Sequence, residues 1–117
     1  MKANLVEFGH LDIEGQSYRK DVVIDGGHIR RRDKGPSKAL VAKWRHTPLT
    51  AAEEIPWGGK RLVVGTGAKG QLTIDAAVYE EAARRGVEIV AMPTAEACHL
   101  LKGVDPHDVF AILHVTC

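Results

Sequence analysis

The chain has 117 residues and a formal net charge of +1 at pH 7, from 16 Lys and Arg against 15 Asp and Glu. Hydrophobic residues make up 44% and charged residues 26%, which excludes wholesale disorder and is typical of a globular domain. The balanced charge gives no general attraction to nucleic acid or to an anionic membrane. No apolar run is long enough to span a bilayer, so we expect no membrane insertion. Two cysteines are too few for a disulfide scaffold, which favours the cytoplasm.

The first part of the chain predicts short strands joined by tight turns. Apolar and polar residues alternate over residues 10–13, and Gly15 can adopt the positive φ of a hairpin turn. Residues 21–24 and 28–30 form a second pair of apolar segments, separated by the turn sequence Asp-Gly-Gly. Together these segments predict an antiparallel β-meander.

The next segment combines turn formers with charge. Residues 33–38 (DKGPSK) predict a surface loop, and residues 39–44 a short strand. Thr50 followed three residues later by Glu53 forms a capping box, which predicts a short helix that ends before Pro56.

Strands and helices alternate in the second half. Gly86 is the C-cap expected after a helix of residues 75–85. The predicted elements are strands over 61–64, 87–91 and 108–115 and helices over 75–85 and 93–102. A β-α-β-α-β order implies parallel strands joined by right-handed crossovers. The sequence therefore predicts an α/β fold in a single layered domain, residues 1–117, in which the antiparallel meander precedes this parallel unit.

A glycine-rich loop, residues 65–70 (GTGAKG), follows the first strand of that unit. A dinucleotide-binding fingerprint needs a helix that opens within the loop, but the predicted helix begins only near Asp75. The loop also lacks the Lys-Ser/Thr pair that completes a phosphate-binding P-loop. Two interpretations remain, an anion-binding turn and a purely structural turn.

The carboxyl ends of the three parallel strands should lie along one edge, where ligands of α/β proteins usually bind. We expect this edge to form a small anion pocket. Its predicted ligand-binding residues are Thr66, Gly67, Lys69, Thr94 and His114. In this interpretation Thr94 caps a helix whose N-terminus favours an anion, and Lys69 adds a positive charge. The alternative is that Thr94 only caps and the final residues complete a sheet.

The cysteines and histidines give weaker indications. His114 and Cys117 have the residue types of an activated thiolate, but alternation along a strand places them on opposite faces. Cys98 lies on the apolar face of the last helix and is predicted to be a core residue. The six histidines show no metal-ligand spacing, so we predict neither a metal nor another cofactor.

A basic run covers residues 30–38. We interpret it as a solvated surface, with a protein-partner surface and nucleic-acid binding as the alternatives. Nucleic acid is disfavoured because Trp44 is the one aromatic residue near the run. Trp57, beside two glycines, is predicted to pack or to anchor a protein partner.

Several of these segments occur in the same order in one family. They are residues 15–24, 30–32, 37–38, 46–47, 62–70, 93–97 and the ending His-Val-Thr-Cys. The chain resembles the Mth-type family of domains of unknown function over residues 10–117. Relatives in that family include a mitochondrial complex I assembly factor and an adipogenesis-associated protein. The resemblance implies a layered α/β fold and no established catalytic activity. One departure is Leu101-Lys102, where many members carry Tyr-Asn.

Three functions follow from these observations. The first is a non-catalytic binding or assembly-type domain that contacts a protein partner and holds a small anionic ligand. The alternative is a small enzyme, with His114 as its candidate catalytic acid or base beside Lys69 and the helix N-terminus at Thr94. The third is a nucleic-acid accessory protein that binds through residues 30–38. The sequence favours the first function and leans against an enzyme.

Overall fold

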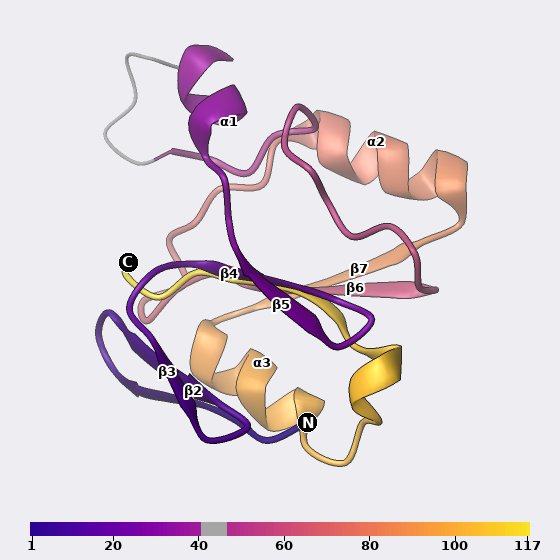
Figure 1. The fold of residues 1–117 in the computed structure, drawn as a ribbon. Coiled ribbons are helices and arrows are strands. Elements are labelled where there is room, and N and C mark those ends of the chain that lie inside the picture. The colour runs from indigo at the N-terminus through magenta and orange to yellow at the C-terminus, as the bar shows by residue number, and fades with distance from the viewer. Residues whose placement is uncertain (41–46) are drawn as a thin grey trace.

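The strands of the molecule divide into two sheets (Figure 1). The structure, a computed structural model, describes residues 1–40 and 47–117. Its elements are β1 (Ala3–Glu7), β2 (His10–Ile13), β3 (Gln16–Tyr18), β4 (Val22–Asp25), β5 (His28–Arg31), α1 (Gly35–Leu40), β6 (Arg61–Gly65), α2 (Ala76–Arg85), β7 (Glu88–Met92), α3 (Thr94–Leu101), a 3₁₀ helix (Pro106–Asp108) and β8 (Phe110–Leu113).

The larger sheet has five strands in the order β5-β4-β8-β6-β7. β8 lies at its centre, parallel to β6 and antiparallel to β4. β6 also pairs in parallel with β7, and β4 forms an antiparallel hairpin with β5. The carboxyl ends of β6 and β8 therefore lie at the same edge as the start of β4.

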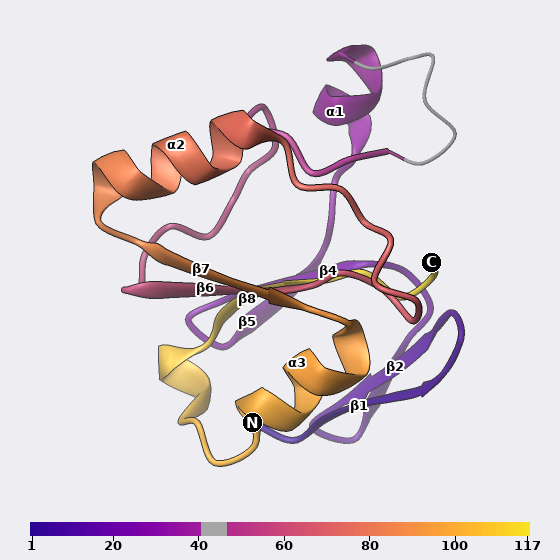
Figure 2. The same ribbon diagram turned by 180° about the vertical axis from the view of Figure 1, so that it is seen from behind.

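Two apolar cores cover the two faces of this sheet. Figures 1 and 2 show α2 on one side of the sheet and α3 on the other. Alternation along the strands sends Val63 into one core and its neighbours Leu62 and Val64 into the other. α3 and the smaller antiparallel sheet, β1-β2-β3, cover the first face. α2 covers the second face together with the segment that contains Leu49 and Ile55.

The second half of the chain forms the predicted β-α-β-α-β unit with parallel strands. Gly86 follows α2 with a φ of 68° and donates to two helix carbonyls, as expected of a C-cap glycine. The last strand is shorter than the predicted 108–115, because Pro106–Asp108 forms a 3₁₀ helix.

The predicted antiparallel strands of the first half are present, but they do not form one meander. β2 and β3 join β1, which the sequence did not predict, in the separate three-stranded sheet. β4 and β5 instead extend the five-stranded sheet by pairing with β8.

Three local predictions differ from the described structure. The loop predicted over residues 33–38 is largely helical, because the Asp33 carboxylate accepts the Gly35 N–H at 2.9 Å and α1 begins there. The strand predicted over residues 39–44 is helical at 39–40, and its other residues lie outside the described ranges. The helix predicted from Thr50 is a turn, since the Glu53 side chain pairs with a buried arginine and not with its own backbone. No helix within residues 1–40 and 47–117 is long and apolar enough to cross a membrane.

Candidate functional site

Strand register gathers three ionisable residues at one edge of the large sheet. The first residue of β4 lies opposite the last residue of β5 on one side and of β8 on the other. Asp21 immediately precedes β4, whereas Arg32 and His114 immediately follow β5 and β8. Asp21 therefore lies between Arg32 and His114 at this edge. The Arg32 N–H extends the ladder by donating to the Asp21 carbonyl at 2.9 Å. All three residues are buried.

Hydrogen-bond donors surround the carboxylate of Asp21. Its Oδ2 accepts from Arg32 Nη1 at 2.9 Å and lies 2.7 Å from His114 Nδ1. Its Oδ1 accepts from the Val115 N–H at 3.0 Å, and Lys34 Nζ lies 3.8 Å from Oδ2. Burial alone would raise the pKa of Asp21, but His114, the Val115 N–H and Lys34 together lower it to about 2.

Arg32 also binds a second buried carboxylate. Its Nε and Nη2 donate to the two oxygens of Glu53 at 2.7 and 2.8 Å, a bidentate pair. The hydroxyl of Ser37 in α1 donates to Glu53 and lies 2.7 Å from the hydroxyl of Thr50. Burial would lower the pKa of Arg32, but its bonds to Glu53 and Asp21 raise it, so the guanidinium stays charged. This buried cluster fixes α1 against the sheet edge.

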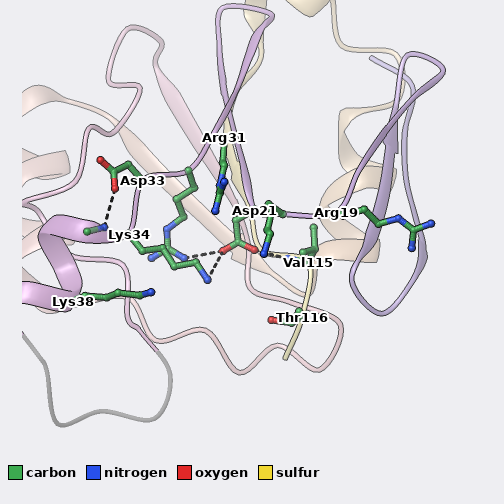
Figure 3. A pocket seen from close by; sticks show the side chains of 11 residues that line it. Arg19, Asp21, Arg31, Asp33, Lys34, Lys38, Val115 and Thr116 are labelled. Carbon is green, nitrogen blue, oxygen red and sulfur yellow. Dashed lines mark hydrogen bonds and ion pairs between the residues drawn. The ribbon is translucent and has the colours of Figure 1, made fainter.

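A cavity of about 590 Å³ opens beside the cluster (Figure 3). We call it the basic cavity, because six of its lining residues are basic and two are acidic. It is lined by Arg19, Lys20, Asp21, Arg31, Arg32, Asp33, Lys34, Gly35, Lys38, Val115 and Thr116. Figure 3 shows the Lys38 side chain extending from α1 toward the centre of the view.

The two carboxylates do not neutralise the basic cavity. Asp21 is already paired with Arg32, and Asp33 accepts a main-chain N–H. Within the described ranges, no ion pair is formed by Arg19, Lys20, Arg31 or Lys38. Residues 41–46 include neither Asp nor Glu, so no carboxylate from that segment can pair with them. The cavity therefore carries excess positive charge.

A smaller cavity of about 240 Å³ shares Lys34, Lys38 and Thr116 with the basic cavity. Its other lining residues are Thr47, Gln71, Leu72, His114 and Cys117. His114 presents its second ring nitrogen on this side, with Nε2 3.3 Å from Thr116 Oγ1. We call the two cavities together the basic site.

The glycine-rich loop holds the chain's own final residues. The main-chain N–H groups of Lys69 and Gln71 donate to the Cys117 oxygen, and that of Ala68 donates to the Thr116 oxygen. Gly67 has a φ of 107°, and a Cβ there would lie 2.3 Å from the Cys117 main-chain carbon. These donors serve the protein itself, which favours the structural interpretation of the loop over an anion-binding turn.

Of the five predicted ligand-binding residues, His114 lines the basic site, and Thr66, Gly67, Lys69 and Thr94 line neither of its cavities. Thr66 and Thr94 are buried, whereas Lys69 is exposed. Thr94 does not cap α3, whose N-cap is Pro93. The Thr94 hydroxyl accepts from the Gly67 N–H at 2.8 Å and donates to the His114 carbonyl at 2.6 Å. Thr94 therefore ties the glycine-rich loop to the end of β8.

The two cysteines lie in different surroundings, Cys98 in the core and Cys117 at the smaller cavity. Cys98 is buried in the core as predicted, and burial raises the pKa of its thiol to about 11. Cys117 lines the smaller cavity with His114, although no hydrogen bond joins the two among the described residues. Three or more potential ligands for a metal ion do not gather anywhere in the described part of the chain.

The sequence suggests that the basic run, residues 30–38, is a solvated surface, but only part of the run is exposed. Arg32 is buried, whereas Arg31 beside it is exposed and lines the basic cavity. The sequence does contain a sign that Arg32 is paired: Asp21 and Arg32 lie at the outer ends of two adjacent strands joined by a short turn. Hairpin register would have placed these opposite charges side by side. Glu53 could not have been found in this way, because its partner is distant in sequence.

Comparison with known proteins places the chain in a family. A family model described as "Protein of unknown function (DUF498/DUF598)" matches residues 4–102. The chain belongs to this family. Asp21, Arg32 and Glu53 lie inside the matched region, and His114 lies beyond it. No curated protein matches the chain.

Solved structures are similar to this DUF498/DUF598 chain over nearly its whole length. A conserved hypothetical protein of Pyrococcus horikoshii, PH1505, is 31% identical, with both chains fully covered and a TM-score of 0.79. A protein named MT938 is 21% identical, with 95% and 94% of the two chains covered and a TM-score of 0.67. XCC1710 of Xanthomonas campestris is 15% identical, with 98% and 86% covered and a TM-score of 0.63. The last two likenesses concern the fold alone.

Proposed function

We propose that this protein is a binding domain for a small multiply charged anion, such as a phosphorylated or polycarboxylate metabolite. The observation that carries the proposal is the basic cavity, whose Arg19, Lys20, Arg31 and Lys38 have no carboxylate partner among the described residues. A volume of about 590 Å³ lies within the range of small-molecule sites, roughly 300 to 1,000 Å³.

The surroundings of the cavity support a preformed site. Arg32, bonded on both sides by buried carboxylates, holds the end of β5 against the start of β4. Ser37 anchors α1, and with it Lys38, to the same cluster. The lysines and arginines around the cavity therefore need little rearrangement to meet an anion, which lowers the entropic cost of binding.

Pyrophosphate is a suitable first probe, measured by isothermal titration calorimetry at constant ionic strength. Lys38→Gln and Arg31→Gln should each weaken pyrophosphate binding about 10-fold, because each removes one cation from the cavity. Lys60→Gln is the matched control, since Lys60 is exposed and lines neither cavity. Raising the salt concentration should weaken binding by the wild type as well.

The proposal fails if pyrophosphate and citrate both leave the wild-type protein without heat of binding at millimolar concentrations. It also fails if Lys60→Gln weakens binding as much as Lys38→Gln does, because the attraction would then be general and not local to the cavity.

A further inference from the structure

Three polar side chains form a continuous line from the buried cluster to the smaller cavity. Asp21 Oδ2 lies 2.7 Å from His114 Nδ1, and His114 Nε2 lies 3.3 Å from Thr116 Oγ1. His114 and Thr116 both line the smaller cavity, whereas Asp21 lies behind them and is almost fully buried. The imidazole therefore joins a buried carboxylate to the space where a ligand would lie.

The contacts of Asp21 fix the position of the proton on the imidazole ring. The Asp21 carboxylate meets an Arg32 N–H and the Val115 N–H, both donors, and its pKa is lowered to about 2. An ionised carboxylate can only accept, so Nδ1 of His114 carries a proton. In the neutral ring Nε2 is then an acceptor that faces the Thr116 hydroxyl at the smaller cavity, where it can also accept a proton.

The charges of the cluster balance without a charged His114. Asp21 and Glu53 are the carboxylates, and Arg32 and Lys34 are the cations within 4 Å of them. An ion pair with His114 is therefore not needed to neutralise this buried site. The ring form with Nδ1–H toward Asp21 is also the one that a general base at Nε2 requires.

We propose that His114 Nε2 is the general base of an esterase site that hydrolyses small anionic esters. This inference rests on the proposed anion-binding function. Lys34 and Lys38 line both cavities, so an anionic group held by them would bring the attached ester next to His114. Asp21 is the positioning residue, because it holds the ring and its tautomer and does not line the smaller cavity where the ester would react.

The reaction consumes one water and uses no other co-reactant. His114 Nε2 removes a proton from water while the water oxygen bonds to the acyl carbon and the carbonyl electrons move onto the oxygen. The excess positive charge of the basic site stabilises the negative charge that develops there. When the tetrahedral intermediate collapses, the carbon–oxygen bond to the alcohol breaks and Nε2–H returns the proton to the leaving oxygen. The products are a carboxylic acid and an alcohol.

The test uses 4-acetoxybenzoate, an anionic ester, and its uncharged methyl ester as the comparison substrate. Release of 4-hydroxybenzoate by the full chain should be saturable, faster than the hydrolysis of the methyl ester, and inhibited competitively by pyrophosphate. His114→Gln should lower kcat at least 100-fold, the usual contribution of a general base, without a matching rise in KM. Asp21→Asn should lower kcat while changing KM little, and Lys60→Gln should change neither.

The outcomes separate this inference from the function on which it rests. Pyrophosphate binding without any turnover of 4-acetoxybenzoate overturns the esterase site and leaves the anion-binding function standing. The esterase site is also overturned if the His114→Gln variant still hydrolyses 4-acetoxybenzoate at the wild-type rate. If His114→Gln does not fold, competition in the wild-type protein decides, because turnover that pyrophosphate does not inhibit takes place outside the basic site. If neither pyrophosphate nor citrate binds, the proposed function itself is removed.

Discussion

Arg32 holds together the structure around the basic site, although its own charge is already paired with carboxylates. Its guanidinium bonds Asp21 and both oxygens of Glu53, and it also donates to the Pro48 carbonyl at 3.2 Å. Three chain segments, around residues 21, 32 and 48–53, thus meet at one cation. Burying these charges is costly, and the cluster is stable only while every member is paired.

Removing Arg32 should therefore destabilise the protein strongly. We expect Arg32→Met to lower the free energy of unfolding by about 3–5 kcal/mol, because two buried carboxylates lose their common partner. Arg31→Met is the matched control, since Arg31 is exposed, and it should change stability by less than about 0.5 kcal/mol. Urea unfolding followed by circular dichroism measures both changes. Similar losses in the two variants would contradict the structural role given to Arg32.

Asp21 predicts a loss of stability in acid. Its pKa is about 2 in the folded protein against an ordinary value of 3.8, so the ionised folded state is favoured above pH 4. As the pH falls from 4 to 2, the unfolded chain takes up the proton first and about 2 kcal/mol of stability is lost. Asp21→Asn, although less stable at neutral pH, should lack this component. If the unfolding free energies of the wild type and of Asp21→Asn fall in parallel between pH 4 and 2, Asp21 is not the source of the acid sensitivity.

At the scale of elements, the glycine-rich loop clamps the end of the central strand. The loop N–H groups bond the oxygens of residues 116 and 117, and the Thr94 hydroxyl bonds the carbonyl of His114. This clamp sets the position of Thr116 and Cys117 in the wall of the smaller cavity. Residues that do not touch a ligand therefore shape the place where one would bind.

Gly67→Ala should release this clamp. The new Cβ would overlap the Cys117 main chain, and the φ of 107° is unfavourable for alanine. Gly86→Ala is the control, because Gly86 has a φ of 68° but a Cβ added there would meet no atom within 4 Å, so it should cost only about 1–2 kcal/mol. Gly67→Ala should cost at least about 2 kcal/mol more in urea unfolding, since the overlap adds to the strain at φ.

Hydrogen exchange locates the same effect within the fold. The amides of Ala68 and Gln71 should lose protection in Gly67→Ala and keep it in Gly86→Ala, because those amides donate to the clamped residues. Retained protection in Gly67→Ala would show that the loop holds the strand end in some other way.

At the scale of the whole molecule, local patterns predicted the α/β order of the second half nearly residue by residue. Apolar periodicity and the Gly86 cap define those elements without reference to distant residues. The first half was predicted less well, because alternation identifies a strand but not the sheet that it joins. β2 (HLDI) and β4 (VVID) are both recognised as strands from local sequence, yet they lie in different sheets.

The basic site lies at the sheet edge that the sequence predicts for a ligand, but most of its lining residues differ from the predicted ones. Parallel topology identified the carboxyl ends of β6 and β8, and His114 lines a cavity there. Lys69 was chosen because its loop resembles an anion-binding turn, whereas the free cations come from residues 19–20, 31 and 38. Burial of Arg32 depends on Glu53, a contact between distant segments that no local pattern records.

The position of β8 at the centre of the large sheet has a consequence for the order of folding during synthesis. β8 follows every other described element in the sequence, yet the β4–β5 hairpin reaches β6 only through it. A nascent chain that has not yet exposed β8 can form the small sheet and α2, but it cannot complete the large sheet. Ribosome-stalled chains that end at residue 108 should be cut rapidly by protease, and chains extended by a linker beyond residue 117 should resist it. The basic site, which borders the end of β8, would therefore form last during folding.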